Sequence, residues 1–240
     1  MKTDIEQFLV SHNWFNQISE DNVSIYHCEF AKDHYKDSLF GELAVAYSDT
    51  LDRAVPKRKA EYLAGRFCAK QALGKHKIEN FIIKSDKNRA PLWPEGIKGT
   101  ITHSNHNALV AVNNSSDVLG IGIDVESVMT DKTMNDVKDA IVKGDENRFL
   151  DLPATTPGIS TGTVVSLIFS IKESFFKAAY PSTGYYFDFD AVTINVLDFE
   201  KNIFSLTVNQ DLNPKMRPGM QCSGQFCFLG EQVLSLLVLR

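Results

Sequence analysis

The sequence lacks the segments that would direct a chain into or across a membrane. Its first residues carry Asp4 and Glu6 and no apolar stretch of the kind found in a signal peptide. The longest aliphatic run, Val233–Leu239, is interrupted by Ser235. That run is far shorter than the roughly 18 apolar residues that cross a bilayer. We therefore expect a cytoplasmic protein.

Cysteine is scarce, and its spacing does not suggest a disulfide framework or a zinc site. The four cysteines are Cys28, Cys68, Cys222 and Cys227, and none of them forms a CxxC pair. Cys222 and Cys227 are five residues apart, so on a regular strand they would face opposite sides. Reduced, mostly buried thiols are the expectation, and a metal or redox site is the alternative.

Neither sign of charge is in large excess, because 25 Lys and Arg stand against 30 Asp and Glu and give a net charge of −5. This balance argues against a protein that grips duplex nucleic acid with its whole surface. The charges are nevertheless unevenly distributed. Residues 52–77 contain eight basic and two acidic side chains, and residues 117–151 contain nine acidic and four basic ones. This pattern fits two solvated faces, or else a polyanionic ligand held by the basic part and a hard cation held by the acids.

A chain of 240 residues with 43% hydrophobic and 23% charged residues is typical of a soluble globular protein. Helical periodicity predicts helices over 4–18, 56–73, 132–151 and 164–180, the last ended by Pro181. Strands are expected at 23–30, 81–84, 99–103, 108–113, 120–126, 191–199, 204–208, 221–228 and 233–239. The expected class is α+β, with two halves of similar element order, 1–118 and 119–240. No sequence repeat is visible.

The first motif that carries chemistry is GIGIDVE at 120–126. Alternation along a strand would bury the aliphatic residues and present Asp124 and Glu126 together on the opposite face, with Gly122 leaving room beside them. Backbone positions two apart on a strand are separated by roughly 6.5–7 Å, so the two carboxylates can meet at one Mg²⁺ ion. The alternative is a half-exposed strand with two solvated acids.

The second motif is FSIKESFFKA at 169–178. On a helix, Glu173 and Lys177 lie one turn apart, opposite the apolar stripe that is formed by Ile168, Ile171, Phe175 and Ala179. Glu173 could be a third metal-facing carboxylate or a base, with Lys177 neutralising the charge of a phosphate. The alternative is an ordinary surface ion pair.

The third motif combines KRKAEYLAGR at 57–66 with RAPLWPEGIKGTITHSNH at 89–106. Arg58 and Arg66 are eight residues apart, which is about 12 Å along a helix, and this spacing suits an elongated anion with separated phosphates. Arg89 lies on the turn before Pro91, and His103 lies at the end of a strand. A lone histidine in that position would more often be a satisfied structural residue.

Taken together, these motifs make the sequence resemble the 4′-phosphopantetheinyl transferases of the larger, Sfp-like type, and most closely the enterobactin synthase component D branch. The resemblance runs from about Pro56 to Pro181, roughly half of the chain. Thr102 and Phe169 differ from the common family forms, Ser and Trp, at positions that are not assigned to catalysis. The resemblance implies two similar α+β halves with the active site in the cleft between them.

The resemblance also implies roles for individual residues. Mg²⁺ would be bound by Asp124, Glu126 and Glu173, with Glu173 also acting as the base and Lys177 facing the pyrophosphate. Coenzyme A would be held by Arg58, Arg66, Arg89 and His103, with an added contact from Ser104.

The implied reaction transfers 4′-phosphopantetheine from coenzyme A to a serine of an apo carrier domain and releases adenosine 3′,5′-bisphosphate. The partners would be aryl- and peptidyl-carrier proteins of non-ribosomal peptide synthetases in siderophore biosynthesis, and the enzyme would be a monomer that does not bind nucleic acid. Two rival functions stay open: a different Mg²⁺-dependent nucleotide phosphohydrolase, and an inactive scaffold of a synthetase assembly.

Overall fold

A computed structural model describes residues 2–240, which form two compact units. Unit 1 comprises residues 2–16 and 21–116, and unit 2 comprises residues 17–20 and 117–240. Each unit has its own sheets, helices and hydrophobic core, and each is described by itself. Across residues 2–240, no helix combines the length and the apolar character that crossing a bilayer requires.

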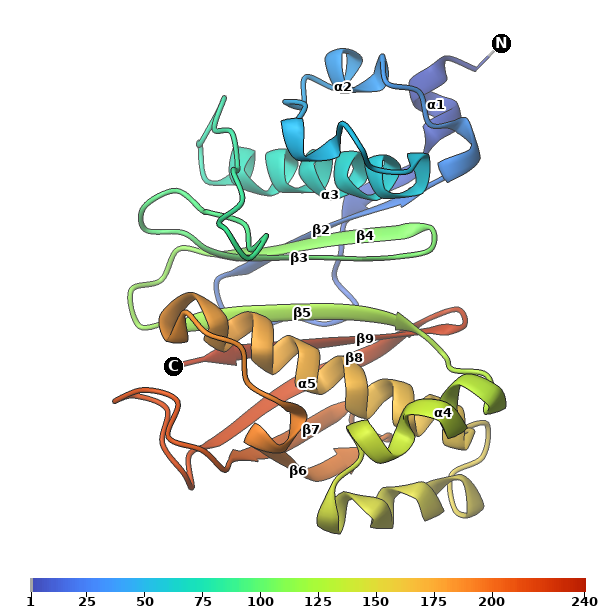
Figure 1. The fold of residues 1–240 in the computed structure, drawn as a ribbon, viewed down its shortest axis with the longest axis vertical. Helices are drawn as coiled ribbons and strands as arrows, with labels where there is room; N and C mark the ends of the chain where they lie inside the picture. The colour runs from blue at the N-terminus through green and yellow to red at the C-terminus, as the bar shows by residue number, and fades with distance from the viewer. Residues whose placement is uncertain (1) are drawn as a thin grey trace. The chain divides into compact units, whose positions relative to one another are not determined.

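Unit 1 is built on a four-stranded antiparallel sheet covered by one long helix (Figure 1). Its strands are β1 (Leu9–Trp14), β2 (Val23–Phe30), β3 (Lys98–Ser104) and β4 (Asn107–Asn113), in the order β1-β2-β4-β3. Helix α3 (Pro56–Lys75) packs on β2, β3 and β4. The short elements are α1 (Asp4–Phe8), α2 (Leu39–Glu42) and the 3₁₀ turns η1 (Lys32–His34) and η2 (Asp49–Leu51).

Helix α3 forms as the sequence predicts. Pro56 occupies its first turn, where the missing N–H costs no hydrogen bond, and Ala60, Leu63 and Ala64 are completely buried against the sheet. Both tryptophans of the chain belong to this unit. Trp14 ends β1 and lies 4.8 Å below the Lys75 ammonium, and the Trp93 ring packs where a side chain at position 99 would otherwise lie.

Two expectations for this unit are wrong. The helix expected over 4–18 ends at Phe8, and Leu9–Trp14 continues as the edge strand β1, paired with β2. The strand expected at 81–84 does not form, and only an isolated bridge joins Ser85 to Pro91 nearby. At Leu9–Trp14, the pairing with β2 decides the structure and local periodicity does not.

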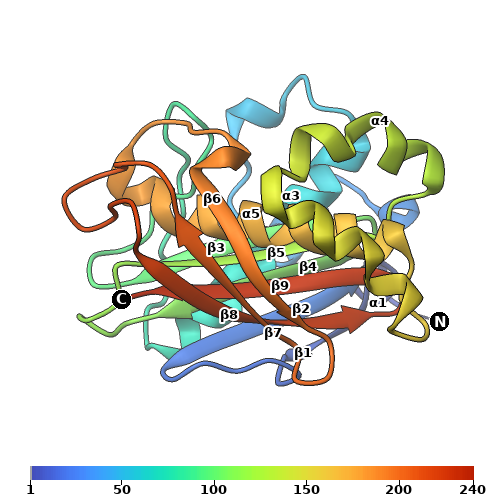
Figure 2. The same cartoon turned by 90° about the horizontal axis from the view of Figure 1, so that it is seen from below.

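Unit 2 carries a five-stranded antiparallel sheet (Figures 1 and 2). Its strands are β5 (Gly120–Ser127), β6 (Val192–Asp198), β7 (Ile203–Val208), β8 (Gln221–Leu229) and β9 (Gln232–Leu239), in the order β5-β9-β8-β7-β6. Helix α5 (Thr161–Thr183) crosses β5 and β9. It is flanked by α4 (Asp131–Ile141) and the 3₁₀ segment η3 (Gly144–Ala154), and the 3₁₀ turn η4 (Phe189–Ala191) precedes β6.

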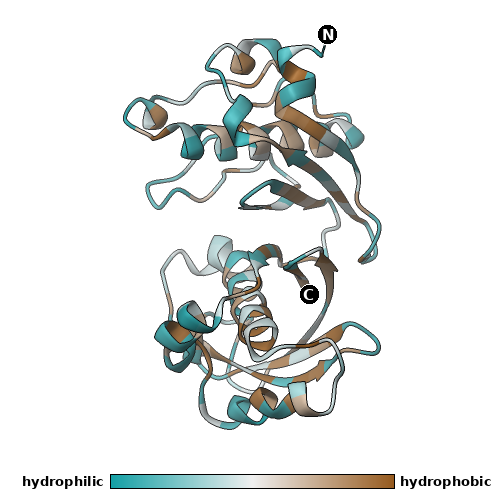
Figure 3. Ribbon diagram, turned by 90° about the vertical axis from the view of Figure 1, so that its right-hand side faces the viewer, coloured by the Kyte–Doolittle hydropathy of each residue, from teal (hydrophilic) through white to brown (hydrophobic). Residues whose placement is uncertain are grey.

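The predicted apolar stripe of α5 is confirmed, because all four of its residues are completely buried: Ile168, Ile171, Phe175 and Ala179. In Figure 3 hydrophobic colouring is prominent on the strands of unit 2, and much of the hydrophilic colouring lies on loops and helices. Pro181 does not end the helix. It lies in the last turn, and α5 ends at Gly184, whose φ of 73° is the left-handed conformation that glycine adopts readily.

The expected α+β class is therefore confirmed. The helix expected over 132–151 is instead a pair, α4 and η3, which are separated by residues 142–143; η3 begins at Gly144, whose φ is 52°. The assignment of separate roles to residues 1–118 and 119–240 stays a prediction.

Candidate active site

The second motif lies directly against the first because α5 packs on β5 with almost no side chain between them. A β-carbon at position 122 would fall 2.6 Å from the carbonyl carbon of Ser174, and still closer to its oxygen. A β-carbon at position 120 would overlap the carbonyl of Ala178 in the same way. The glycines of GIGIDVE therefore admit a helix backbone, and they do not leave open space beside the acids as the sequence suggested.

Small serines on α5 complete this seam. The Ser170 hydroxyl donates to the Asp124 carbonyl oxygen at 3.0 Å, and the Ser174 hydroxyl donates to the Ser235 carbonyl oxygen of β9 at 3.1 Å. The Ser235 hydroxyl lies 2.8 and 2.7 Å from the other two hydroxyls. One turn earlier, Ser166 accepts from the Met129 N–H at 2.8 Å. These bonds satisfy buried hydroxyls and fix the position of α5 along β5.

Asp124 is buried by this arrangement, with 2% of its surface exposed, so the strand is covered on both faces. The expectation of an open carboxylate face is wrong at this position. Lys177 Nζ lies 2.5 Å from Asp124 Oδ1 and donates to the Ile123 carbonyl oxygen at 3.3 Å. The lysine thus reaches across the seam to the strand.

The other two candidate acids, Glu126 and Glu173, are half-buried and electrostatically coupled to Asp124. Burial, reinforced by the charges of Asp124 and Glu173, raises the pKa of Glu126 to about 7. Burial also raises the pKa of Glu173, with the Lys177 ammonium opposing the rise and Asp124 adding to it. Two carboxylates with raised pKa values, Glu126 and Glu173, thus lie near the buried Asp124 in a partly dehydrated site.

This donor set fits Mg²⁺ by its chemistry, because it offers only oxygen ligands and because a divalent cation would relieve the mutual repulsion. Within residues 2–240, no three side chains among His, Cys, Asp and Glu are gathered closely enough to hold a metal ion. The Lys177 ammonium lies on Asp124 instead and supplies part of the positive charge. The predicted ligation by Asp124, Glu126 and Glu173 stays a prediction.

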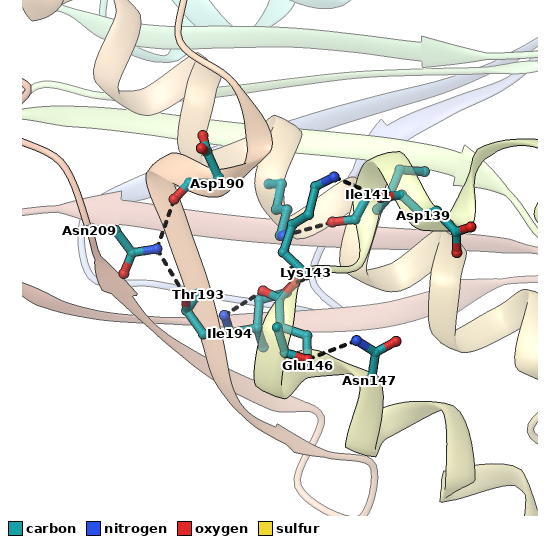
Figure 4. A network of polar contacts seen from close by, with 11 residues as sticks. Asp139, Ile141, Lys143, Glu146, Asn147, Asp190, Thr193, Ile194 and Asn209 are labelled. Atoms are coloured by element: carbon teal, nitrogen blue, oxygen red, sulfur yellow. Dashed lines mark hydrogen bonds and ion pairs between the residues drawn. The ribbon is translucent and has the colours of Figure 1, made fainter.

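The residue before Glu173 anchors α5 through the carboxylate of Glu146, whose hydrogen bond from Ile194 is drawn in Figure 4. Lys172 is 2% exposed, and its ammonium lies 2.6 Å from Glu146 Oε2 and donates to the Ile141 carbonyl oxygen at 2.8 Å. Glu146 is completely buried and accepts from the backbone N–H groups of Ile194 at 2.8 Å and Lys143 at 2.9 Å. One buried ion pair therefore ties α5 to η3, β6 and the end of α4.

A cavity of about 200 Å³ opens beside Glu173. Its wall is mainly aromatic, with Phe176 and Tyr186 stacked at 5.3 Å and an interplanar angle of 18°. The remaining lining residues are Lys172, Phe175, Phe187, Asp188, Phe189 and Val192. Such a wall suits an uncharged, partly apolar ligand segment whose reactive end lies at the carboxylate.

In unit 1, the structure brings Arg58 and His103 together. Arg58 Nη1 lies 2.9 Å from His103 Nε2, so the third motif joins α3 to the end of β3. The Glu61 carboxylate lies close to both side chains, 3.7 Å from His103 Nδ1 and 3.9 Å from Arg58 Nη1. Ser104 follows His103 at the end of β3.

The other two candidate arginines are placed differently. Arg66 stacks on Tyr62 at 4.7 Å, donates to the Ser85 hydroxyl at 3.2 Å and lines a cavity of about 310 Å³ together with Lys70. Arg89 is exposed, has a φ of 69°, and belongs to a turn in which its N–H donates to the Asp86 carbonyl oxygen. Among the predicted coenzyme A residues, the structure thus brings Arg58 and His103 into direct contact.

Two family models match this chain. The 4′-phosphopantetheinyl transferase N-terminal domain matches residues 46–113, and the 4′-phosphopantetheinyl transferase superfamily matches residues 120–219, so that together they span more than half of the 240 residues. The chain belongs to the 4′-phosphopantetheinyl transferase superfamily. The two matches contain all of the candidate residues, from Arg58 to Lys177, and the predicted family is confirmed.

Among its relatives, the chain is 35% identical over 136 residues to enterobactin synthase component D of Salmonella typhimurium, covering 57% of this chain and 54% of that protein. It is 35% identical over 146 residues to 4′-phosphopantetheinyl transferase Svp of Streptomyces mobaraensis, covering 60% and 57%. It is 33% identical over 139 residues to 4′-phosphopantetheinyl transferase PptT of Mycobacterium tuberculosis, covering 58% of each. The chain thus spans little more than half the length of these relatives.

Sequence reasoning missed several residues that build the site. Lys172 lies inside the second motif but was not singled out, and Glu146 showed no local signal. The serines at 166, 170 and 174 recur every four residues, and with Ala178 they form a small-residue stripe that could have identified the face of α5 against β5. Glu61 could have been found as the single acid of a basic helix.

Proposed function

We propose that the protein transfers the 4′-phosphopantetheine group of coenzyme A to a serine hydroxyl of apo carrier-protein domains and releases adenosine 3′,5′-bisphosphate. The observation that carries the proposal is the seam between β5 and α5, which sets Asp124, Glu126, Glu173 and Lys177 within one electrostatically coupled group. Membership of the superfamily supports the same reaction class.

In this proposal Glu173 accepts the proton of the attacking serine, directly or through water. Its raised pKa favours that role, because a carboxylate with a higher pKa is a better proton acceptor near neutral pH. Lys177 offers its ammonium to the charge that develops on the departing nucleotide. Asp124, Glu126 and Glu173 would hold Mg²⁺, which would supply further positive charge to the pyrophosphate.

The nucleotide end of coenzyme A is assigned to the basic residues of unit 1, namely Arg58, Arg66, Arg89 and His103, with Ser104 beside them. The cavity at Arg66 supports part of this assignment, since its lining combines two cations with the ring of Tyr62 and includes no acid. Arginine side chains are well suited to bind phosphate groups in this way. The aromatic cavity at Glu173 is proposed to receive part of the uncharged pantetheine arm.

The proposed carriers are aryl- and peptidyl-carrier domains of non-ribosomal peptide synthetases that make siderophores, because several relatives carry the name enterobactin synthase component D. A cytoplasmic location and a monomeric state also belong to the proposal.

The test is intact-protein mass spectrometry of apo aryl-carrier and peptidyl-carrier domains after incubation with the protein, coenzyme A and Mg²⁺. The expected result is a mass increase of one phosphopantetheine on each carrier, together with release of adenosine 3′,5′-bisphosphate. The matched control is a carrier whose acceptor serine is replaced by alanine. Consumption of coenzyme A in the absence of any carrier would indicate a phosphohydrolase, and no turnover would indicate a scaffold.

A further inference from the structure

One carboxylate lies inside the basic cluster of unit 1. Helix α3 carries six basic residues and a single acid, Glu61. Glu61 is 9% exposed, and the groups recorded around its carboxylate are cationic or can become so. Lys57 Nζ lies at 3.8 Å, Arg58 Nη1 at 3.9 Å and His103 Nδ1 at 3.7 Å.

A negative charge in this place weakens the attraction of the cluster for an anion. Burying a carboxylate also costs free energy unless its neighbours compensate for the lost hydration. If the cluster only had to attract phosphate, a neutral residue at position 61 would serve better. The geometry around His103 indicates what the carboxylate contributes.

The proton on the His103 ring can be located from its contact with Arg58. A guanidinium group can only donate, so His103 Nε2, 2.9 Å from Arg58 Nη1, accepts that hydrogen bond and carries no proton. The ring proton is then on Nδ1, which faces Glu61. Two charged groups of α3, Arg58 and Glu61, lie against the ring, while its register partner on β4 is Ala108 and its chain neighbours are Thr102 and Ser104.

We propose that Glu61 is a positioning residue for phosphate recognition, which holds the His103 ring with Nδ1–H turned inward and stabilises the imidazolium that forms when a phosphate binds. The inference rests on the proposed function, because the phosphate is that of coenzyme A. An arriving phosphate takes the Arg58 N–H away from His103 Nε2. The released lone pair of Nε2 binds one proton from solvent, and the new N–H can donate to the phosphate. The bond between Nδ1 and its proton is unchanged, so binding takes up one proton.

The first test follows the His103 ring in the ligand-free protein by ¹H–¹⁵N NMR across a pH titration. In Glu61→Gln, which keeps the shape of the side chain and removes its charge, the titration midpoint of His103 should fall by roughly 1 pH unit. The matched control is Asp37→Asn, which removes a carboxylate that contacts Lys59 of the same helix at 3.4 Å and should leave the midpoint unchanged. Glu61→Asp retains the negative charge, so its His103 midpoint should lie closer to that of wild type than to that of Glu61→Gln.

The second test is titration calorimetry with coenzyme A and with 3′-dephospho-coenzyme A, in two buffers of different ionisation enthalpy. Wild type should take up a proton on binding coenzyme A at a pH above the His103 midpoint. Glu61→Gln should lose about tenfold or more in affinity for coenzyme A, the scale of one weakened charge-assisted contact, and much less for the dephospho form. Asp37→Asn should behave like wild type with both ligands.

An unmoved His103 midpoint in Glu61→Gln would overturn the proposal, and so would a moved midpoint with wild-type preference between the two coenzymes. If Glu61→Gln does not fold, Glu61→Asp is compared with wild type instead. The shorter aspartate side chain places the carboxylate farther from the His103 ring, so the His103 midpoint and the preference for coenzyme A over its dephospho form should both fall slightly. A variant identical to wild type in both measurements would count against the positioning role of Glu61. A wild-type protein that binds neither coenzyme would refute the proposed function instead, while the NMR midpoints would still measure the coupling between Glu61 and His103.

Discussion

Replacing Gly122 by alanine should damage the site without touching any of its charged groups. The added β-carbon would lie 2.6 Å from the carbonyl carbon of Ser174 and 3.0 Å from the N–H nitrogen of Ala178, with the Ser174 oxygen closer still. Because a β-carbon does not approach such atoms within 3.0 Å, the backbone of α5 must withdraw from β5 by at least about 1 Å. Glu173 is the residue before Ser174 and must move with it.

The expected magnitudes follow from this displacement. Overpacking of a tight contact typically costs about 1–3 kcal/mol, which for a chain of this size lowers the melting temperature by roughly 2–12 °C. A displacement of about 1 Å at a reacting group can cost on the order of 10²-fold in rate. Gly122→Ala should therefore remain folded at 20 °C and transfer phosphopantetheine to an apo carrier about 100-fold more slowly than wild type.

The assay pairs thermal denaturation with the carrier-loading reaction, and the control is Gly74→Ala in α3. A β-carbon at position 74 meets nothing within 4 Å, so this change should raise the stability by about 0.5–1 kcal/mol and leave turnover unchanged. If Gly122→Ala melted and turned over like wild type, α5 could not lie against the backbone of β5 as described.

Four further changes test other parts of the structure. Asp124→Asn should reduce carrier loading at least ~10²-fold, and isothermal titration should show weaker Mg²⁺ binding in the presence of coenzyme A; wild-type turnover at limiting Mg²⁺ would contradict the metal assignment. Lys177→Ala should slow carrier loading by a similar factor; a loss of stability with full activity would show that Lys177 serves only as a structural ion-pair partner. Lys172→Met should destabilise by about 3–5 kcal/mol in urea unfolding, because it leaves a buried carboxylate unpaired, and a change below 1 kcal/mol would contradict that burial. Burial lowers the pKa of His27 below 6.5, so the contribution of neutral His27 to the free energy of unfolding is fully present above pH 6.5 and should decline as the pH falls below it. In His27→Gln, the melting temperature should therefore depend less on pH between about pH 5 and 6.5 than in wild type. Replacing the exposed His34 by Gln is the control and should leave this pH dependence unchanged.

Local periodicity was sufficient for most of the elements that carry the site. The alternation in 120–126 and the helical stripe through Ile168 and Phe175 predicted β5 and α5 almost to their ends, because both segments bury a regular apolar face. The same reasoning failed for Leu9–Trp14, since that strand exists through its pairing with β2 and carries little alternation of its own.

Contacts between distant residues explain what the sequence could not provide in the site. Helical spacing predicts that Lys177 lies near Glu173, and its ammonium does oppose the rise in the pKa of Glu173. That spacing could not predict that the same ammonium contacts Asp124, 53 positions earlier in the chain. The burial of Asp124 depends on a helix that follows it by some forty residues, so alternation alone made that face look open. Only the residue types at 124, 126, 173 and 177 and their grouping could be predicted.

Because Trp14 and Trp93 both belong to unit 1, the unfolding of unit 1 changes the tryptophan fluorescence, whereas unit 2 contains no tryptophan. Fluorescence excited selectively in the indole band follows unit 1, whereas far-ultraviolet circular dichroism follows the helices and strands of both. Coincident transitions would mean that the two units unfold as one cooperative body, and separated transitions would assign an individual stability to each. The position of the two indole rings thus gives a label-free way to measure whether the residues proposed to bind coenzyme A in unit 1 and the acids of unit 2 lose their structure together or one after the other.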